Sequence, residues 1–138
     1  MRLATSPGVS VTLCVGGIPL EEYDDPDASD NDHPLKGVKY VEAVPGANFV
    51  VRLSSTQLQL GGCASDQVLF TIYMDGKRVL GRVLPVNTMA FFTYDAKGVV
   101  KQSQSRFVTE KFAFTALNTG WPMILGRYRW ISELTSAS

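Results

Sequence analysis

Residues 21–34, EEYDDPDASDNDHP, hold seven of the chain's thirteen acidic residues and its only histidine. Carboxylate oxygens are the ligands that calcium takes in proteins. An EF-hand loop places them at its first, third and fifth positions, with glycine at the sixth and glutamate at the twelfth. Counted from Asp25, the sixth position is Asp30 and the twelfth is Lys36. The stretch therefore does not predict an EF-hand, and it leaves open only a looser calcium site.

Zinc binding and nucleophilic catalysis need partners that the sequence does not supply. Structural zinc takes several His or Cys ligands, but His33 is the only histidine, and Cys14 and Cys63 lie far from it in the chain. A catalytic nucleophile needs an adjacent base, and the sequence holds neither a G-x-S-x-G elbow nor a phosphate-binding glycine loop. Paired carboxylates could meet in any acidic chain. We therefore predict that the protein is not an enzyme and holds no metal or cofactor.

The acidic stretch is typical of a solvated loop, because neighbouring Asp side chains repel one another and favour an extended chain. The functional alternative is a recognition element for a basic partner, such as a basic protein tail. On that hypothesis the partner-binding residues are Glu22, Asp24, Asp25, Asp27, Asp30 and Asp32, together with Arg127 and Arg129 of the segment GRYRW.

The second half of the chain is basic. Residues 1–76 carry four basic and ten acidic residues, a net of −6, and residues 77–138 carry nine basic and three acidic, a net of +6. Basic residues interleaved with aromatics can bind nucleic acid through phosphate contacts and stacking. At strand spacing, however, Lys and Arg more often protect strand edges while the aromatics are core. The segment at 126–130 is the one cluster that predicts an exposed cationic and aromatic patch.

Size and composition predict one soluble domain. The chain has 138 residues, 45% of them apolar and 19% charged, with a net charge of zero. Zero net charge gives no overall attraction to nucleic acid or membrane. The N-terminal segment MRLATSPGVSVTLCV lacks the continuous apolar stretch of a signal peptide, and no window predicts a membrane span. We therefore expect an intracellular location, cytoplasmic or nuclear.

Short alternating segments with frequent turn signals predict an all-β fold. We expect one antiparallel β-sandwich over residues 1–138, with about eight or nine short strands, and do not distinguish a jelly roll from an immunoglobulin-like arrangement. The expected strands cover 9–15, 39–44, 49–53, 67–74, 78–84, 89–94 and 105–117. A further short strand is suggested at 57–60, and the turn at 95–98 leads into VVKQ at 99–102.

The turns and loops between these strands are predicted from Gly, Pro, Asn and Asp. Asp75-Gly76 is the preferred pair of a type I′ hairpin. PGAN at 45–48 predicts a second hairpin, and DAKG at 95–98 a further turn. The acidic loop is expected over 21–36. The tail segment RYRWISEL fits a strand or a short helix, and the end is expected to fray from about residue 132.

Four segments give the sequence a resemblance to a known family. They are a G-x-P-L-x-E-Y segment before the acidic stretch, a K-Y-V-E-A segment followed by G-A-x-F, a D-G-K that ends an apolar strand, and a late F-x-F. Here these are Gly17 to Tyr23, Lys39 to Phe49, Asp75 to Lys77, and Phe112 with Phe114. Together they resemble a fungal family known only as a domain of unknown function. The resemblance covers roughly residues 9–117 and implies a β-rich, intracellular protein with no assigned activity.

The function that the sequence favours is a non-enzymatic domain that binds another protein or assembles with itself through edge strands. The alternatives are a nucleic-acid-binding domain that uses the basic second half, and a small ligand-binding or carbohydrate-binding domain. Cys14 lies in an alternating apolar run and is expected to be a buried thiol. Whether it pairs with Cys63 does not follow from the sequence.

Overall fold

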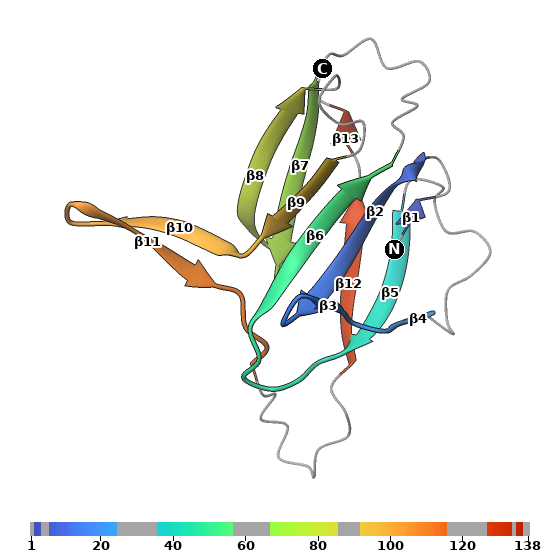
Figure 1. The fold of residues 1–138 in the computed structure, drawn as a ribbon, viewed down its shortest axis with the longest axis horizontal. Helices are drawn as coiled ribbons and strands as arrows, with labels where there is room; N and C mark the ends of the chain where they lie inside the picture. Colours follow the sequence, from blue (N-terminus) through green and yellow to red (C-terminus); the bar gives the residue numbers. More distant parts are fainter. Residues whose placement is uncertain are drawn as a thin grey trace.

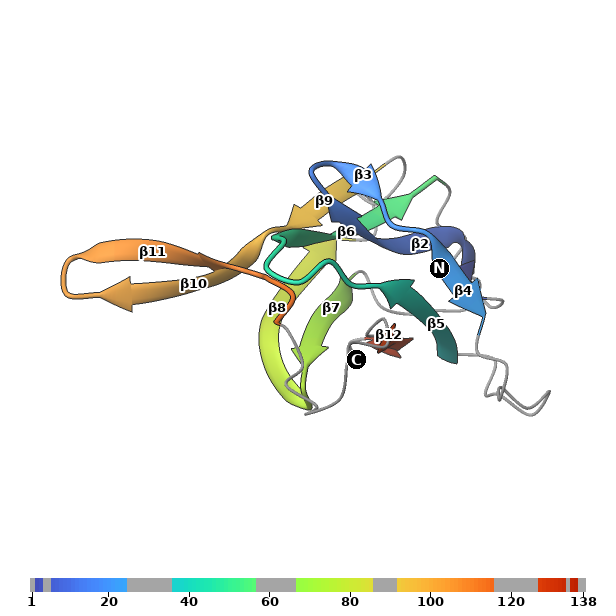
Figure 2. The ribbon, with the colours of Figure 1, turned by 90° about the horizontal axis from the view of Figure 1, so that it is seen from below.

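The computed structural model of the chain describes residues 2–3, 6–24, 36–56, 67–85, 92–115, 127–133 and 135–136, and every regular element within these ranges is a β-strand. All the strand pairs among them are antiparallel. The strands form two layers and one projecting hairpin (Figure 1, Figure 2). The predicted all-β antiparallel sandwich is therefore confirmed.

The first layer is built on two long strands, β2 (Ser6–Val15) and β6 (Phe49–Ser55). Strand β9 (Phe92–Ala96) pairs with the other side of β6, and β1 (Arg2–Leu3) pairs with β2. The short strand β3 (Ile18–Pro19) folds back onto the end of β2 as a tight hairpin. The order of this sheet is therefore β1-β2-β6-β9, with β3 beside β2.

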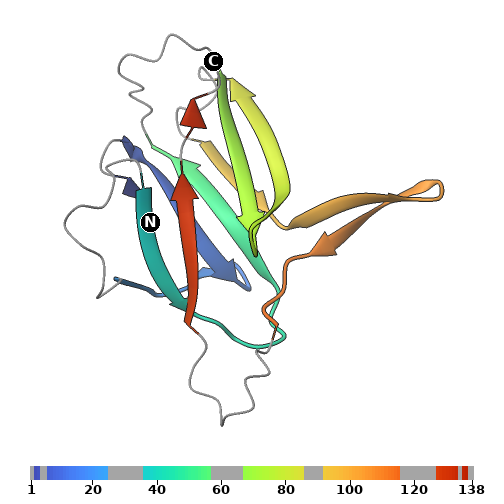
Figure 3. The same cartoon turned by 180° about the vertical axis from the view of Figure 1, so that it is seen from behind.

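The second layer consists of two three-stranded sheets, of order β12-β5-β4 and β13-β7-β8. Their strands are β4 (Glu22–Asp24), β5 (Lys36–Glu42), β7 (Gln67–Met74), β8 (Lys77–Pro85), β12 (Arg127–Glu133) and β13 (Thr135–Ser136). A single residue separates β12 from β13, and the two follow one line (Figure 3). The chain end therefore joins the two sheets, by pairing first with β5 and then with β7.

The core between the layers follows the period of two that the strands show in sequence. Along β6 the side chains alternate strictly between buried and half-buried. Burying an aliphatic or aromatic side chain stabilises the fold by about 1.5–3 kcal/mol. The buried apolar cluster comprises Val9, Val11, Leu13, Val41, Ala43, Phe49, Val51, Leu53, Val68, Ile72, Leu84, Ala96, Phe112 and Phe114.

The hairpin of β7 and β8 has the turn that its sequence predicts. Asp75 and Gly76 both have positive φ, 50° and 74°. A type I′ turn requires positive φ at both central residues, because only then does its twist match that of the strands. The preferred Asp-Gly pair is thus placed where the turn needs it.

The predicted hairpin of residues 39–44 with 49–53 is wrong. Strand β5 pairs with β4 and β12, whereas β6 pairs with β2 and β9, so the two belong to different layers. Gly46, with φ of 78°, lies in the crossing. The amides of Gly46 and Phe49 donate to the carbonyl oxygens of Phe114 and Phe112, at 2.8 and 3.0 Å. Residues 112–114 thus satisfy the backbone groups that a hairpin partner would otherwise have satisfied.

Two further turns differ from the prediction. Residues 95–98 do not turn the chain back, because Asp95 and Ala96 remain in β9 and β10 (Gly98–Ser103) follows almost at once. The reversal comes later, at Gln104-Ser105, and leads into β11 (Arg106–Lys111). The sequence predicts one strand over 105–117, but β11 ends at residue 111.

The loop and tail predictions also need correction. Residues 22–24 of the predicted loop 21–36 form β4, because Tyr23 and its neighbours pair with β5 and Asp24 forms an ion pair with Lys39. Lys36 already belongs to β5, and residues 25–35 lie outside the described part. Of the tail that was expected to fray, residues 132–133 and 135–136 pair with β5 and β7, and the other residues from 134 on lie outside the described part. Thirteen strands are formed by the described residues rather than eight or nine, because four of them are only two or three residues long.

Candidate interaction surfaces

Strands β10 and β11 form a hairpin that projects away from both layers, and we call residues 97–111 the arm (Figure 1, Figure 2). Their register runs without a break from Gly98↔Lys111 to Ser103↔Arg106. Each strand pairs only with the other among the described strands. Every residue of the arm from Val100 to Lys111 is exposed. A two-stranded ribbon is at best marginally stable by itself in water, so the arm depends on how its base is held.

The base of the arm is anchored in the core. A Cβ built on Gly98, which is buried, would overlap the carbonyl oxygen of Glu110, so the two strands meet here as closely as glycine allows. Phe112 follows β11 directly, and its amide donates to the carbonyl of Lys97 at 3.2 Å. Its ring stacks on Phe49 of β6, with centroids 5.6 Å apart. The arm therefore leaves the body from a packed aromatic cluster.

Phe114 completes that aromatic cluster. Its ring lies 4.5 Å from Phe49, between centroids, and its amide donates to Ala47 at 3.0 Å. Ala113, which lies between Phe112 and Phe114 in the sequence, forms an isolated β-bridge with Asn48. The F-x-F segment that the sequence marked thus buries both rings and exposes the residue between them. Its role is to fix the exit of the arm.

The two faces of the arm differ in chemistry. Residues directly opposite in an antiparallel pair project from the same face, and neighbours along a strand project from opposite faces. One face of the arm therefore carries the pairs Val100↔Thr109 and Gln102↔Phe107. Val100 is 60% exposed and Phe107 is 77% exposed. Lys111, opposite Gly98, projects from the same face, and Val108 projects from the other. This face thus joins two exposed apolar side chains to Gln102, Thr109 and one lysine, and we call it the apolar face.

The other face of the arm is charged. Lys101 and Glu110 form an exposed cross-strand ion pair with an N–O distance of 2.5 Å. Arg106 lies on this face beside the turn, opposite Ser103. The arm has one acidic residue, Glu110, and four basic residues, which are Lys97, Lys101, Arg106 and Lys111. The arm therefore carries a net charge of +3.

Residues 18–24 form a second surface, which we call the acidic edge. Its strand β4 lies at the end of the molecule opposite the arm, whereas β3 lies nearer the middle (Figure 1, Figure 2). Ile18 lies beside the β2–β3 turn and is 71% exposed. The hydroxyl of Tyr23 donates to Glu21 at 2.9 Å, and Asp24 pairs with Lys39 of β5. The acidic edge thus combines three carboxylates with one strongly exposed apolar side chain.

The residues predicted to bind a partner are placed as follows. Glu22 is half-buried and Asp24 is exposed, both on β4. Arg127 and Arg129 lie on β12, opposite Glu42 and Tyr40 of β5. Strands β4 and β12 flank β5, so the backbones of the acidic and basic sets lie on its two sides. The remaining predicted residues, Asp25, Asp27, Asp30 and Asp32, lie outside the described part of the chain, as does His33.

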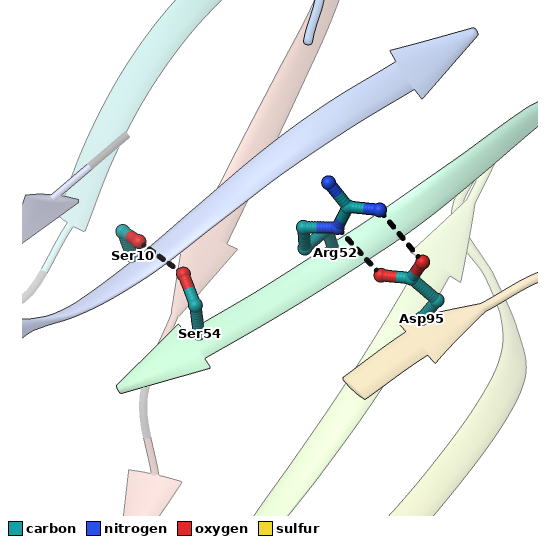
Figure 4. Close-up of polar contacts among 4 residues, drawn as sticks. All are labelled: Ser10, Arg52, Ser54 and Asp95. Carbon is teal, nitrogen blue, oxygen red and sulfur yellow. Dashed lines mark hydrogen bonds and ion pairs between the residues drawn. The ribbon is translucent and has the colours of Figure 1, made fainter. Parts of the chain in front are cut away.

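A polar row lies on the outer face of the first layer (Figure 4). Arg52 on β6 donates to both carboxylate oxygens of Asp95 on β9, at 2.8 and 2.9 Å. These hydrogen bonds hold the pKa of Asp95 below its usual value. The hydroxyls of Ser10 and Ser54 bond to each other at 2.7 Å. The polar groups of this row thus bond to each other, which is typical of cross-strand stabilisation.

Two further expectations concern cysteine and metal. Cys14 is a buried free thiol, as its sequence context predicts, and burial raises its pKa. Cys63 lies outside the described part. Among the residues that the structure covers, no three His, Cys, Asp or Glu side chains gather as metal ligands would. Nor do the described ranges form a helix of the length and apolarity that a membrane crossing needs.

The projecting arm was not predicted from the sequence, although the sequence indicated parts of it. The predicted strand 105–117 began at the correct place, and Lys101, Arg106 and Lys111 were part of the basic half. What the sequence lacked was a turn signal, because Gln104-Ser105 is not a preferred turn pair. Gln104 nevertheless takes a positive φ of 53°. The exposure of Phe107 differs from the expectation that the aromatics among the basic residues belong to the core.

The fold and its surfaces define an all-β sandwich that carries a projecting basic and apolar hairpin. Comparison with known families identifies the family to which the chain belongs. The model of the domain of unknown function DUF7918 matches residues 8–121, and the chain belongs to this family. No curated protein and no solved structure matches the chain.

Proposed function

We propose that this domain is a non-enzymatic protein-interaction module and that the arm is its contact element. The observation that carries the proposal is the exposure of Phe107 and Val100 on one face of a two-stranded ribbon. Contiguous exposed apolar side chains rimmed by polar residues mark interaction surfaces. A partner laid on this face would remove apolar area from water and would order a ribbon that has little support of its own.

The anchoring of the arm supports the same proposal. Phe112 and Phe114 pack against Phe49, so the ribbon leaves the body in a fixed direction. A contact element held in its bound geometry loses less conformational entropy on binding than a flexible loop. We also propose that the protein is intracellular and of fungal origin, as the motif resemblance implies.

The test is retention of proteins from an extract of the source organism by the tagged full chain, read by mass spectrometry. Phe107→Ser removes the central apolar side chain of the arm. Tyr73→Ser is the matched control, because Tyr73 is also a strongly exposed aromatic residue on a hairpin, β7–β8. We expect specific proteins to be retained by the wild type and by Tyr73→Ser and lost with Phe107→Ser. Equal retention by all three would refute the arm as contact element.

Nucleic-acid binding is the second candidate, favoured by the net charge of the arm and by Phe107 near its tip. Against it, Lys101 is already paired with Glu110, and the exposed apolar face offers nothing to a phosphate backbone. Fluorescence anisotropy with labelled DNA and RNA oligonucleotides separates the two candidates. Binding that weakens steeply with salt and is lost in Arg106→Glu/Lys111→Glu would favour nucleic acid.

Binding of a small ligand or carbohydrate has less support. The polar row of the first layer is the surface where hydroxyl and charged groups gather (Figure 4). There the guanidinium of Arg52 already engages Asp95 through two hydrogen bonds. A ligand would first have to break these bonds.

A further inference from the structure

We infer that the arm binds a second copy of this chain through the free edge of β11, which pairs antiparallel with β11 of the other copy about Val108. The two arms together then form one four-stranded sheet. The inference rests on the proposed function, in which the arm is the contact element, and it names the partner.

The outer edge of β11 offers backbone groups to a further strand. Among the described strands, β11 pairs with β10 alone. A two-residue turn separates Ser103 from Arg106, and the pair that flanks such a turn is a hydrogen-bonded one. Hydrogen-bonded and non-hydrogen-bonded pairs alternate along an antiparallel ladder. The N–H and C=O groups of Phe107 and Thr109 therefore point to the outer edge.

Symmetry restricts how two such edges can pair. Two identical strands that pair antiparallel are related by a two-fold axis perpendicular to the sheet, so each residue lies opposite one from the same face of the other arm. The register is therefore centred on a single residue. Centred on Val108, the pairing sets Phe107 of each copy opposite Thr109 of the other. These are the two residues whose backbone groups point outward, so they can bond to each other.

Charge selects the register centred on Val108. In this register Arg106 of each copy lies directly opposite Glu110 of the other. Opposite charges that face each other across two strands stabilise a sheet, and like charges destabilise it. Lys101 of the same copy already contacts Glu110, so the carboxylate would lie between two cations. A register centred on Thr109 loses both new ion pairs and sets Val108 against Glu110.

The same register joins the apolar faces of the two arms. Phe107 lies diagonally across from Phe107 of the other copy, at about 7–8 Å, a separation that aromatic side chains can span. Thr109 lies between Val100 of its own copy and Phe107 of the other. A two-stranded ribbon is marginally stable, whereas three or more strands with a hydrophobic face can be stable. The pairing thus turns two marginal ribbons into one sheet with a continuous apolar face.

The free edges of β10 and β8 fit a second copy less well. Lys101 is the only charged residue of β10, so no symmetric register of that edge forms an ion pair. Strand β8 carries three basic residues and no acidic one, and it ends in Pro85. Basic residues and proline at an edge are features that oppose pairing with another chain. The edge of β11 combines both charges within five residues.

The projection of the arm leaves room for the pairing. The arm extends away from both layers of the body (Figure 1, Figure 2). Because the two arms run antiparallel, the two bodies lie at opposite ends of the four-stranded sheet. Each strand of the arm spans about 20 Å at about 3.3 Å per residue, and Lys111 of one copy reaches only the turn of the other. Each copy uses its β11 edge once, so the assembly closes as a dimer.

Sedimentation velocity of the purified full chain over a range of concentrations tests the inference. We expect a weak dimer, because the contact is small. Arg106→Glu and Glu110→Arg each place two like-charged pairs in the dimer and should associate at least about tenfold more weakly. Tyr73→Ser, which alters an exposed residue outside the arm, should associate like the wild type.

Restoration by charge exchange makes the test specific. An equimolar mixture of Arg106→Glu and Glu110→Arg should associate again, because one variant is acidic at both positions and the other is basic at both. The double variant Arg106→Glu/Glu110→Arg should also associate, which rules out misfolding as the cause of the loss. Circular dichroism shows whether each single variant is folded.

Disulfide formation identifies the edge that pairs. Each variant carries Cys63→Ser, and Cys14 is buried, so only the introduced thiol reacts. Val108→Cys should give a disulfide-linked dimer on mild oxidation, because facing residues of a non-hydrogen-bonded pair have Cα atoms about 4.5 Å apart, which a disulfide spans. Val100→Cys is the matched control at another exposed valine of the arm. It should not cross-link, because three strand spacings of about 4.8 Å separate it from its counterpart.

Three outcomes overturn the inference, and they differ in what they leave standing. A monomer at all concentrations, with retention of other proteins that still depends on Phe107, overturns the second copy as partner but keeps the proposed function. A monomer whose retention of proteins is unchanged by Phe107→Ser overturns both. A dimer that neither charge reversal weakens and that Val108→Cys does not cross-link overturns the pairing through β11. Cross-linking by Val100→Cys in such a dimer would assign the contact to β10 and keep the arm as the contact element.

Discussion

Two hairpins among the described strands, β7–β8 and β10–β11, differ in what lies against them. In β7–β8, one face contributes Val68, Ile72 and Leu84 to the core between the layers. In β10–β11, both faces meet solvent, and only the base is buried. Both hairpins turn at residues with positive φ and both have an antiparallel register. What separates them is the presence or absence of an opposing layer.

This difference shows where the stability of each hairpin comes from. The β7–β8 hairpin is held along its length by burial of apolar area, the dominant favourable term in folding. The β10–β11 hairpin is held at one end, through Gly98 and the stacked rings of Phe49 and Phe112. A ribbon of this kind adds little to the free energy of folding. Its exposed apolar face therefore has to be explained by something other than the stability of the monomer.

The largest expected difference between the hairpins comes from truncating an apolar side chain in each. Ile72→Ala should destabilise the fold by about 2–5 kcal/mol, because it leaves a cavity between the layers. Val100→Ala should change the free energy of unfolding by less than about 0.5 kcal/mol, as is usual at exposed positions. Urea denaturation of both variants at one concentration measures the contrast. A loss at Val100 as large as that at Ile72 would show that the arm is already covered, as it would be in a stable oligomer.

The β7–β8 hairpin could be predicted from the sequence and the arm could not, for a physical reason. Strict alternation over 67–74 and the Asp-Gly pair at 75–76 agree, and both reflect local backbone and burial preferences. The pattern of residues 105–117 also predicts a strand. It reports a strand with two different faces and does not report what lies opposite either face. Exposure of Phe107 is a property of the whole topology, because none of the described strands packs against β10–β11.

The candidate site shows the same limit. The acidic composition near Glu22 and Asp24 is visible in the sequence. That Asp24 pairs with Lys39, and that Glu22 and Tyr23 form a strand, depends on the register of β4 with β5. The crossing of the chain between layers at Gly46 also depends on a distant segment, 112–114. Pairings over such separations leave no local signal.

A second prediction concerns the base of the arm. Gly98→Ala should loosen the hairpin and destabilise the fold by about 1–3 kcal/mol, because its Cβ would overlap the backbone of Glu110 in a packed place. In Gly98→Ala, hydrogen exchange read by NMR should show that the amides of residues 98–111 exchange faster than those of β7–β8. Gly81→Ala is the matched control, because its Cβ would meet only the guanidinium of Arg78, which can move aside. Equal protection of the arm in wild type and Gly98→Ala would contradict the close approach at its base.

The turns give a third and smaller contrast. Gly76→Ala should cost about 1–2 kcal/mol, because an L-residue with a side chain is strained at its φ of 74°. Gln104→Gly should have the opposite sign and slow exchange within the arm, with a gain below about 1 kcal/mol, because glycine relieves the strain at a φ of 53°. Thermal unfolding measures the first change, and amide exchange of residues 98–111 measures the second. Faster exchange of the arm in Gln104→Gly would show that its turn needs the glutamine side chain.

The cross-strand ion pairs give the smallest and most specific contrast. Arg52 and Asp95 lie in the first layer with side chains 31% and 27% exposed, whereas those of Lys101 and Glu110 in the arm are 60% and 58% exposed. The hydrogen bonds from Arg52 lower the pKa of Asp95. A depressed folded-state pKa contributes stability that is present above the unfolded value, about 3.9, and is lost as the pH falls through the folded value.

Arg52→Gln should therefore lower the free energy of unfolding at neutral pH, and the loss should shrink as the pH falls below about 4. Lys101→Gln should have an effect below about 0.5 kcal/mol, because solvent screens an exposed pair. Urea denaturation at neutral and at acid pH measures both. A loss in Arg52→Gln that is the same at both pH values would show that Arg52 acts by packing and not through Asp95. A large loss in Lys101→Gln would show that solvent does not reach the charged face of the arm, and the contrast between the two hairpins would then no longer hold.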